Sequence, residues 1–144
     1  MKPQETIDYH LKTSWYNVFK MYSQMASRYD FSQAMGFVLI NIDEKDGTTP
    51  AKLAPSMGIE ATSLSRLLRS MEDKGYIYRI GNKKDRRSVH ICLTELGLEK
   101  QKISKRTIKA FNNHLINSIP KEEVVVFFKV IQQINSLTNS YNSD

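Results

Sequence analysis

The middle of the chain holds two short helical segments joined at one glycine and followed directly by two strand-like segments. Thr49 and Pro50 begin the first helix, a capping hydroxyl followed by proline at the first helical position. Gly58 breaks that helix. The second helix is expected from Ala61 to Lys74 and ends at Gly75, a residue suited to a helix C-terminus. This order predicts a helix–turn–helix, whose second helix is able to enter a DNA major groove.

The segments that follow Gly75 alternate as β-strands do. Residues 76–80 are aromatic and β-branched, and residues 88–93 place Val89, Ile91 and Leu93 on one face. The polar residues 81–87 separate them. We therefore expect a β-hairpin with a basic tip.

Long amphipathic segments flank this region. Apolar residues recur every three or four positions over residues 6–29, and residues 32–42 are apolar nearly all round, as in a buried central helix. Thr94 is expected to cap a long helix that reaches about Ser118, and Pro120 begins a last helix. The fold class predicted is mainly α with a small β-hairpin (α+β). Residues 6–29 and 108–138 carry more apolar surface than one small lobe covers, which favours a two-fold dimer.

Positive charge is concentrated in one part of the chain. The net charge is +6, and residues 64–91 carry eight Lys or Arg against three Asp or Glu. Such a local excess is expected of a surface that faces a polyanion. The alternative is a solvated surface that happens to be basic.

The second helix of the motif has two distinct faces. With 100° per residue, Leu67, Leu68 and Met71 fall within about 60° of Leu64 and predict the buried face. Arginine forks onto guanine O6 and N7, and hydroxyls bind phosphates or base edges. The alternative is an ordinary solvated face. The residues predicted to bind DNA from this helix are Thr62, Ser63, Ser65, Arg66 and Arg69.

The hairpin loop places four cations around one carboxylate. A basic loop of this kind suits the minor groove, where Lys83, Lys84 and Arg86 are expected to contact DNA. Asp85 is expected to pair with Arg87 and so to organise the loop. The alternative is a loop kept soluble by its charge.

With these features the chain resembles the MarR family of bacterial transcription regulators. Residues 85–97 (DRRSVHICLTELG) are similar to that family's wing signature, D-x-R followed by a strand and L-T-x-x-G, and residues 53–77 are similar to its helix–turn–helix. The resemblance implies one winged helix–turn–helix domain over residues 1–144. Residues 32–94 would bind DNA, and residues 1–31 and 95–144 would form dimerisation helices. It further implies a homodimeric repressor of pseudo-palindromic operators in double-stranded DNA, released by a small-molecule effector.

Aromatic side chains are abundant around the first helix and its exit. The resemblance implies an effector pocket between the dimerisation helices and the DNA-binding lobe, to which Tyr22, Tyr29 and Phe31 would contribute and which would take a small aromatic or amphipathic molecule. The alternative is that these residues belong to the core and the dimer seam.

Several classes of protein are disfavoured. Cys92 is the single cysteine and the three histidines are widely separated, so neither a disulfide framework nor a metal site is expected. The chain shows no catalytic constellation and no phosphate-binding glycine loop, so neither an enzyme nor a cofactor is expected. With no membrane-length apolar run and no export signal, we expect a cytoplasmic protein. The rival functions are a winged-helix protein–protein adaptor without DNA binding and, more remotely, an enzyme on a helical scaffold.

Overall fold

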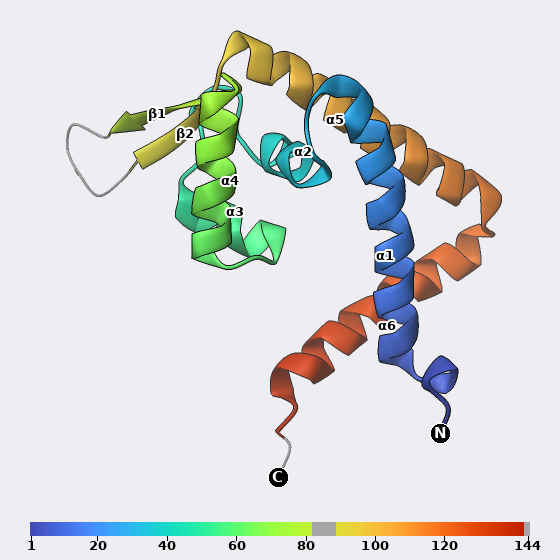
Figure 1. The fold of residues 1–144 in the computed structure, drawn as a ribbon. Coiled ribbons are helices and arrows are strands. Elements are labelled where there is room, and N and C mark those ends of the chain that lie inside the picture. Colours follow the sequence, from blue (N-terminus) through green and yellow to red (C-terminus); the bar gives the residue numbers. More distant parts are fainter. Residues whose placement is uncertain (82–88, 143–144) are drawn as a thin grey trace. The chain divides into compact units, whose positions relative to one another are not determined.

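The computed structural model describes residues 1–81 and 89–142 and confirms the predicted fold class, mainly helical with one antiparallel hairpin (Figure 1). The chain divides into two compact units, Met1–Lys105 and Arg106–Asp144, with the division inside α5. Short 3-10 turns precede and follow α1. The elements are α1 (Ile7–Ala26), α2 (Gln33–Ile40), α3 (Pro50–Met57), α4 (Ala61–Asp73), β1 (Ile77–Gly81), β2 (Val89–Leu93), α5 (Glu95–Ser118) and α6 (Lys121–Ser140).

Side-chain hydroxyls begin three of the helices. Thr6, Ser32 and Thr94 each accept a hydrogen bond from the backbone N–H three residues later, at the starts of α1, α2 and α5. The prediction that Thr49 caps α3 through its hydroxyl is wrong, because that side chain makes no capping hydrogen bond. Pro50, at the first helical position, already has the backbone angle that a helix needs, so α3 begins there without the cap.

The core of the first unit surrounds α2, as its apolar sequence predicted. Val38 and Leu39 have no exposed surface, and α3, α4 and the hairpin each contribute buried side chains around them. The buried side chains around α2 include Leu53, Leu64, Leu68, Met71, Tyr76, Ile77 and Ile91, all at most 2% exposed.

The hairpin pairs in a register that runs from Ile77 opposite Leu93 to Gly81 opposite Val89. Its central residue Ile91 is fully buried and also pairs with Thr48, with both N–H···O distances 2.9 Å. The alternation of apolar residues in the sequence does not predict this extra pairing. It attaches the hairpin to the loop that follows α2.

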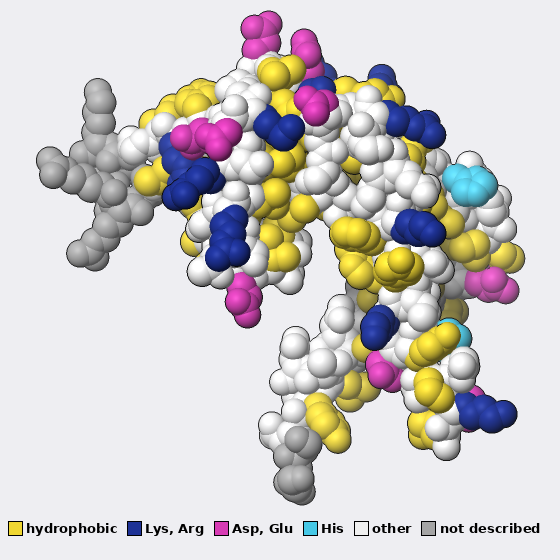
Figure 2. Space-filling model, viewed as in Figure 1, with side chains coloured by type: hydrophobic (Ala, Val, Ile, Leu, Met, Phe, Trp, Pro, Cys, Tyr) yellow, Lys and Arg dark blue, Asp and Glu magenta, His cyan; other side chains and the backbone are white. Residues whose placement is uncertain are grey.

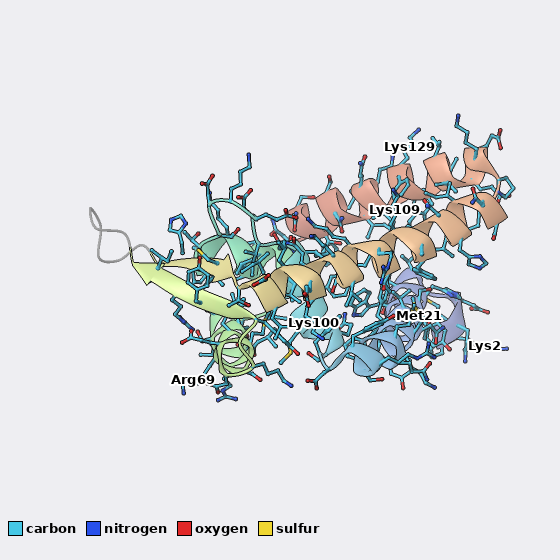
Figure 3. All side chains as sticks on the ribbon, turned by 90° about the horizontal axis from the view of Figure 1, so that it is seen from above. Lys2, Met21, Arg69, Lys100, Lys109 and Lys129 are labelled. Atoms are coloured by element: carbon cyan, nitrogen blue, oxygen red, sulfur yellow. The ribbon has the colours of Figure 1, made fainter. Side chains whose placement is uncertain are left out.

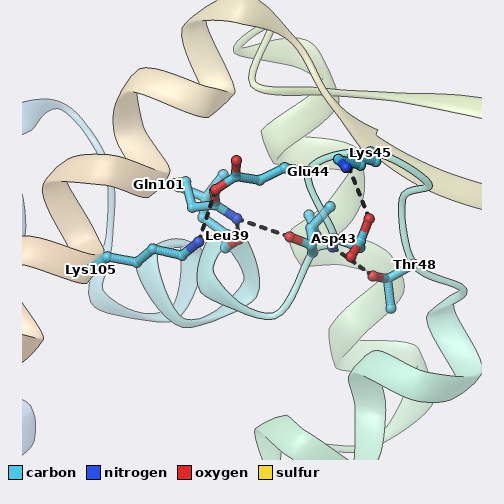
Figure 4. Close-up of polar contacts among 8 residues, drawn as sticks. Leu39, Asp43, Glu44, Lys45, Thr48, Gln101 and Lys105 are labelled. Carbon is cyan, nitrogen blue, oxygen red and sulfur yellow. Dashed lines mark hydrogen bonds and ion pairs between the residues drawn. The ribbon is translucent and has the colours of Figure 1, made fainter.

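That loop, residues 43–48, is shaped by local hydrogen bonds (Figure 4). The Asp43 carboxylate accepts the backbone N–H groups of Asp46 and Lys45, at 2.8 and 2.9 Å. These bonds hold the pKa of Asp43 below its usual value. Gly47 has a φ of +69°, and a Cβ there would lie 2.6 Å from the Ile91 carbonyl oxygen, so glycine is required where the loop meets β2.

The part of α5 inside the first unit buries small and polar residues, namely Gly97, Gln101 and Ser104. Gln101 Nε2 donates to the carbonyl oxygens of Leu39 and Ile42, at 2.7 and 2.9 Å (Figure 4). These carbonyls lie at the end of α2, where helical partners run out, so Gln101 caps α2 from a distant element.

The second unit carries α6 and the remainder of α5. Its large apolar side chains are substantially exposed, with Phe127 and Phe128 at 57% and 56%. Side chains of the same kind lie open on α1 in the first unit, where hydrophobic residues are visible on the surface in Figure 2. Among the described residues, no helix is both long enough and apolar enough to cross a lipid bilayer.

Candidate nucleic-acid interface

The inner face of α4 holds this helix firmly on the core. Leu64, Leu68 and Met71 are 2%, 1% and 0% exposed, and Leu67 is half-buried, so the predicted buried face is confirmed. The hydrophobic effect on these side chains sets which face of α4 points outward.

The turn before α4 depends on Gly58. This residue ends α3 in the left-handed region, with φ 62° and ψ 29°. A glycine adopts this conformation without the steric cost that other residues meet. Pro55 lies in the last turn of α3 and is exposed, so the short α3 accommodates it close to its end.

The outer face of α4 exposes all five residues predicted to bind DNA from this helix. Four of them, Thr62, Ser65, Arg66 and Arg69, line one open hollow together with Ala61. Figure 3 shows Arg69 reaching away from the lobe. The Ser65 hydroxyl donates to the Ala61 carbonyl at 3.0 Å, so its oxygen remains able to accept a hydrogen bond. The face therefore presents cationic donors beside hydroxyl groups.

The first turn of α4 also suits an anion. Glu60 precedes the helix, and its carboxylate makes no capping hydrogen bond with the first-turn N–H groups. Those groups and the positive end of the helix dipole favour negative charge, such as a phosphate, near Thr62 and Ser63. The Glu60 carboxylate itself would repel a phosphate, so it is the unfavourable group of this surface.

An ion pair joins α4 to the hairpin. Arg79 Nε on β1 donates to Glu72 Oε2 at 2.8 Å, and both side chains are nearly half exposed. An exposed pair of this kind contributes at most about 1 kcal/mol to stability. It does place a further arginine next to α4. The sequence did not predict this contact, because charge pairing between a helix and a strand leaves no periodic signal.

Part of the predicted site lies outside the described residues. Lys83, Lys84, Asp85, Arg86 and Arg87 belong to the segment 82–88, and their roles stay predictions from the sequence. The described strands end at the pair Gly81 and Val89, from which that segment continues.

The three residues proposed for an effector pocket have different surroundings. Tyr22 and Phe31 are 8% and 7% exposed, whereas Tyr29 is 39% exposed. The Tyr22 ring meets Phe37 edge to face at 5.9 Å between centroids, and the rings of Tyr29 and Phe31 stack at 6.5 Å. Burial raises the pKa of the Tyr22 hydroxyl. The structure thus brings Tyr29 and Phe31 together and packs Tyr22 on another aromatic ring.

The part of the chain that the structure describes contains histidines, acidic side chains and one cysteine. No group of three His, Cys, Asp or Glu side chains there is placed to hold a metal ion. Cys92 is half-buried on β2 as a free thiol.

Comparison with known proteins relates this fold and surface to transcription regulators. The family model described as "MarR family" matches residues 31–89. The "HTH-type transcriptional regulator SarZ" of Staphylococcus aureus (strain USA300) is 27% identical over 109 residues, which cover 75% of this chain and 74% of SarZ.

Two solved structures of DNA complexes are also similar. The S. aureus MepR–DNA complex superposes with a TM-score of 0.84 at 22% identity, covering 91% of this chain and 97% of MepR. Streptococcus pneumoniae FabT in complex with DNA gives a TM-score of 0.76 at 26% identity, covering 92% of this chain and 95% of FabT. Of these relatives, SarZ is named a transcriptional regulator, and MepR and FabT were solved in complex with DNA.

Proposed function

We propose that this chain is a DNA-binding transcription regulator of the MarR family, and that it acts as a homodimeric repressor of pseudo-palindromic operators, released by a small molecule. The observation that carries DNA recognition is the outer face of α4. Arg66 and Arg69 project beside exposed hydroxyls, on a helix whose opposite face is buried. A rigid helix with this chemistry is what direct reading of base edges requires.

The hairpin supplies the second contact in this proposal. Lys83, Lys84 and Arg86 reach the minor groove or its phosphate walls, and Asp85 organises the loop by pairing with Arg87. The support is the charge pattern of the sequence. Cationic side chains are attracted to the strong negative potential of a narrow minor groove.

The dimer is proposed from exposed apolar surface on each unit separately. On α1, Trp15, Tyr16 and Phe19 are 53%, 63% and 42% exposed, and α6 exposes Phe127 and Phe128 as well as several valines. Surface of this kind is uncommon on a monomer and marks an interface. The dimerisation helices of the proposal are therefore residues 1–31 and 95–144, and the DNA-binding lobe is 32–94.

The dimer makes a direct prediction. Sedimentation equilibrium at micromolar concentration, without DNA, is expected to give twice the mass of the chain, because burying about 2,000 Å² or more stabilises a permanent dimer. Replacing Phe127 by Asp should shift the equilibrium towards monomer, since a carboxylate would be buried in the interface. The control is Lys129→Asp, a charged position on the same helix. A monomeric wild-type chain would contradict the proposal.

The effector is assigned to the aromatic set. We place a small aromatic or amphipathic molecule against Tyr29, the exposed member, with its stacked neighbour Phe31 behind it. Tyr22, which packs on Phe37, is included in this pocket on the family resemblance alone. Offset stacking on such rings is the usual way in which an aromatic ligand is held.

The function is tested by footprinting the protein on the DNA upstream of its own gene. We expect a protected, roughly two-fold symmetric site, and an affinity that falls steeply as salt rises, because bound phosphates release counterions. An unrelated fragment of equal length is the control. Equal affinity for both fragments would leave only non-specific binding. No binding to either fragment would favour the protein–protein adaptor instead.

A further inference from the structure

We propose that Tyr76 is a positioning residue that ties the end of α1 to the recognition helix α4 and thereby sets the separation of the two recognition helices in the dimer. The inference rests on the proposed dimeric, DNA-binding function. It concerns four segments of the first unit: the end of α4, the start of β1, the start of α5, and the turn that follows α1.

The backbone of Tyr76 is hydrogen-bonded to the last turn of α4. Its N–H donates to the Met71 carbonyl at 3.0 Å, directly after the last turn of that helix. Its carbonyl accepts the N–H of Thr94 at 3.1 Å, at the start of α5. The ring is 2% exposed, so packing fixes its direction. The phenol is therefore held in a defined position relative to α4.

The hydroxyl of Tyr76 binds the turn that follows α1. It donates to the Asp30 carbonyl at 2.5 Å, across 46 residues of sequence. Asp30 follows the 3-10 turn Ser27–Tyr29 that extends α1, and it lies in the left-handed region with φ 61° and ψ 37°. Burial and the nearby Asp30 charge raise the pKa of Tyr76, so the hydroxyl keeps its proton and remains a donor.

A second side-chain donor binds the same turn after α1. Lys100 Nζ on α5 donates to the Tyr29 carbonyl at 2.6 Å and lies 5.9 Å from the centre of the Tyr76 ring. Figure 3 shows Lys100 on α5. The carbonyls of Tyr29 and Asp30 lie at the end of the helical segment, where such groups lack helical partners. The exposed Lys74–Asp30 pair, at 3.6 Å, adds little.

These contacts have a mechanical consequence for a dimer held through α1. If the end of α1 is fixed to the turn after α4, each recognition helix keeps one orientation relative to the dimer helices. Two rigidly placed helices fit half-sites at one spacing only. Without the hydrogen bonds of Tyr76 and Lys100 to the turn after α1, each DNA-binding lobe would rotate relative to α1 and accept other half-site spacings. Its contacts with a single half-site would be unchanged.

The experiment compares Tyr76→Phe, which removes only the hydroxyl, with Tyr78→Phe, a matched control whose ring is 45% exposed on the same hairpin. The DNA probes are the footprinted operator, the same operator with its centre lengthened or shortened by one base pair, and an isolated half-site. One base pair moves a half-site by about 3.4 Å and turns it by about 35°.

For wild type and Tyr78→Phe we expect a loss of affinity of at least about tenfold on either altered spacing. For Tyr76→Phe that loss should shrink to about threefold or less, with half-site affinity unchanged. Lys100→Met, with the control Lys102→Met, deletes the second bond and should move the spacing penalty in the same direction. If Tyr76→Phe fails to fold, the comparison of Lys100→Met with Lys102→Met still tests the proposal.

The result that would overturn the proposal is an undiminished spacing penalty in folded Tyr76→Phe and Lys100→Met. A second measurement needs no DNA. Hydrogen exchange of the backbone amides of residues 27–31 should be faster in Tyr76→Phe than in wild type. Unchanged exchange would also contradict the proposal. A wild-type protein that binds no operator refutes the proposed function itself, and that outcome is recognised before any variant is compared.

Discussion

Replacing Gly97 with alanine is expected to destabilise the protein by about 3 kcal/mol, because the site has no room for a methyl group. A Cβ at Gly97 would collide with the Tyr76 carbonyl oxygen and would lie 2.9 Å from the carbonyl carbon. These atoms are backbone, and the same carbonyl accepts the Thr94 N–H, so neither side moves aside cheaply. α5 would have to shift away from β1, and the packing of its first turn would be lost.

The sign of this effect makes the test sharp. Gly97 lies in the first turn of a helix, where propensity alone predicts that alanine stabilises by about 0.5–1 kcal/mol. Gly81→Ala is the control, since a Cβ there meets nothing within 4 Å. Urea unfolding of both variants measures the difference in the free energy of unfolding. A Gly97→Ala protein as stable as wild type would show that α5 does not approach β1 so closely.

Arg66→Ala is expected to cost about 1–3 kcal/mol of operator binding and to relax base preference at one position of each half-site. Arg66 is exposed on the outer face of α4, opposite the buried Leu64 and Leu68. A groove-facing arginine donates two parallel hydrogen bonds to one guanine, and alanine leaves those acceptors without partners. Anisotropy titrations with a panel of single base-pair variants of the operator give both the affinity and the preference.

The matched control is Arg106→Ala, which removes the same charge from an exposed position on α5. It separates recognition from the general loss of positive charge. If Arg66→Ala weakened binding equally on all variants and also flattened the salt dependence, the side chain would bind phosphate rather than a base. That outcome would remove Arg66 from base reading.

Periodicity anticipated those features that repeat along one element. The buried face of α4, the apolar α2 and the alternation of the hairpin were all predicted from the spacing of apolar residues, and the structure places them so. The outer face of α4 followed from the same reasoning, since residues opposite a buried stripe must face solvent. The DNA-binding and loop-organising roles predicted within residues 82–88 remain predictions.

Features made by pairs of distant residues were missed or wrong. Gln101 is fully buried because it donates to two carbonyls about 60 residues away, whereas a glutamine in a helix ordinarily suggests an exposed position. The Thr49 cap failed for the opposite reason: a favourable local pattern was present, but the side chain did not form the bond. Arg79 reaches Glu72 across a turn that no helical spacing describes.

By itself the sequence determined which faces of each element are apolar, where most helices begin and end within about two residues, and where the positive charge is concentrated. The exception is α1, which ends at Ala26, three residues before the predicted end, and continues as a 3-10 turn. Those properties depend on residues that are neighbours along one helix or strand. Only the tertiary structure decided why Gly97 must be glycine and what Tyr76 and Gln101 bind. Their partners come from elements far away in the chain, and a hydrogen bond or close contact between such elements leaves no periodic trace in either segment.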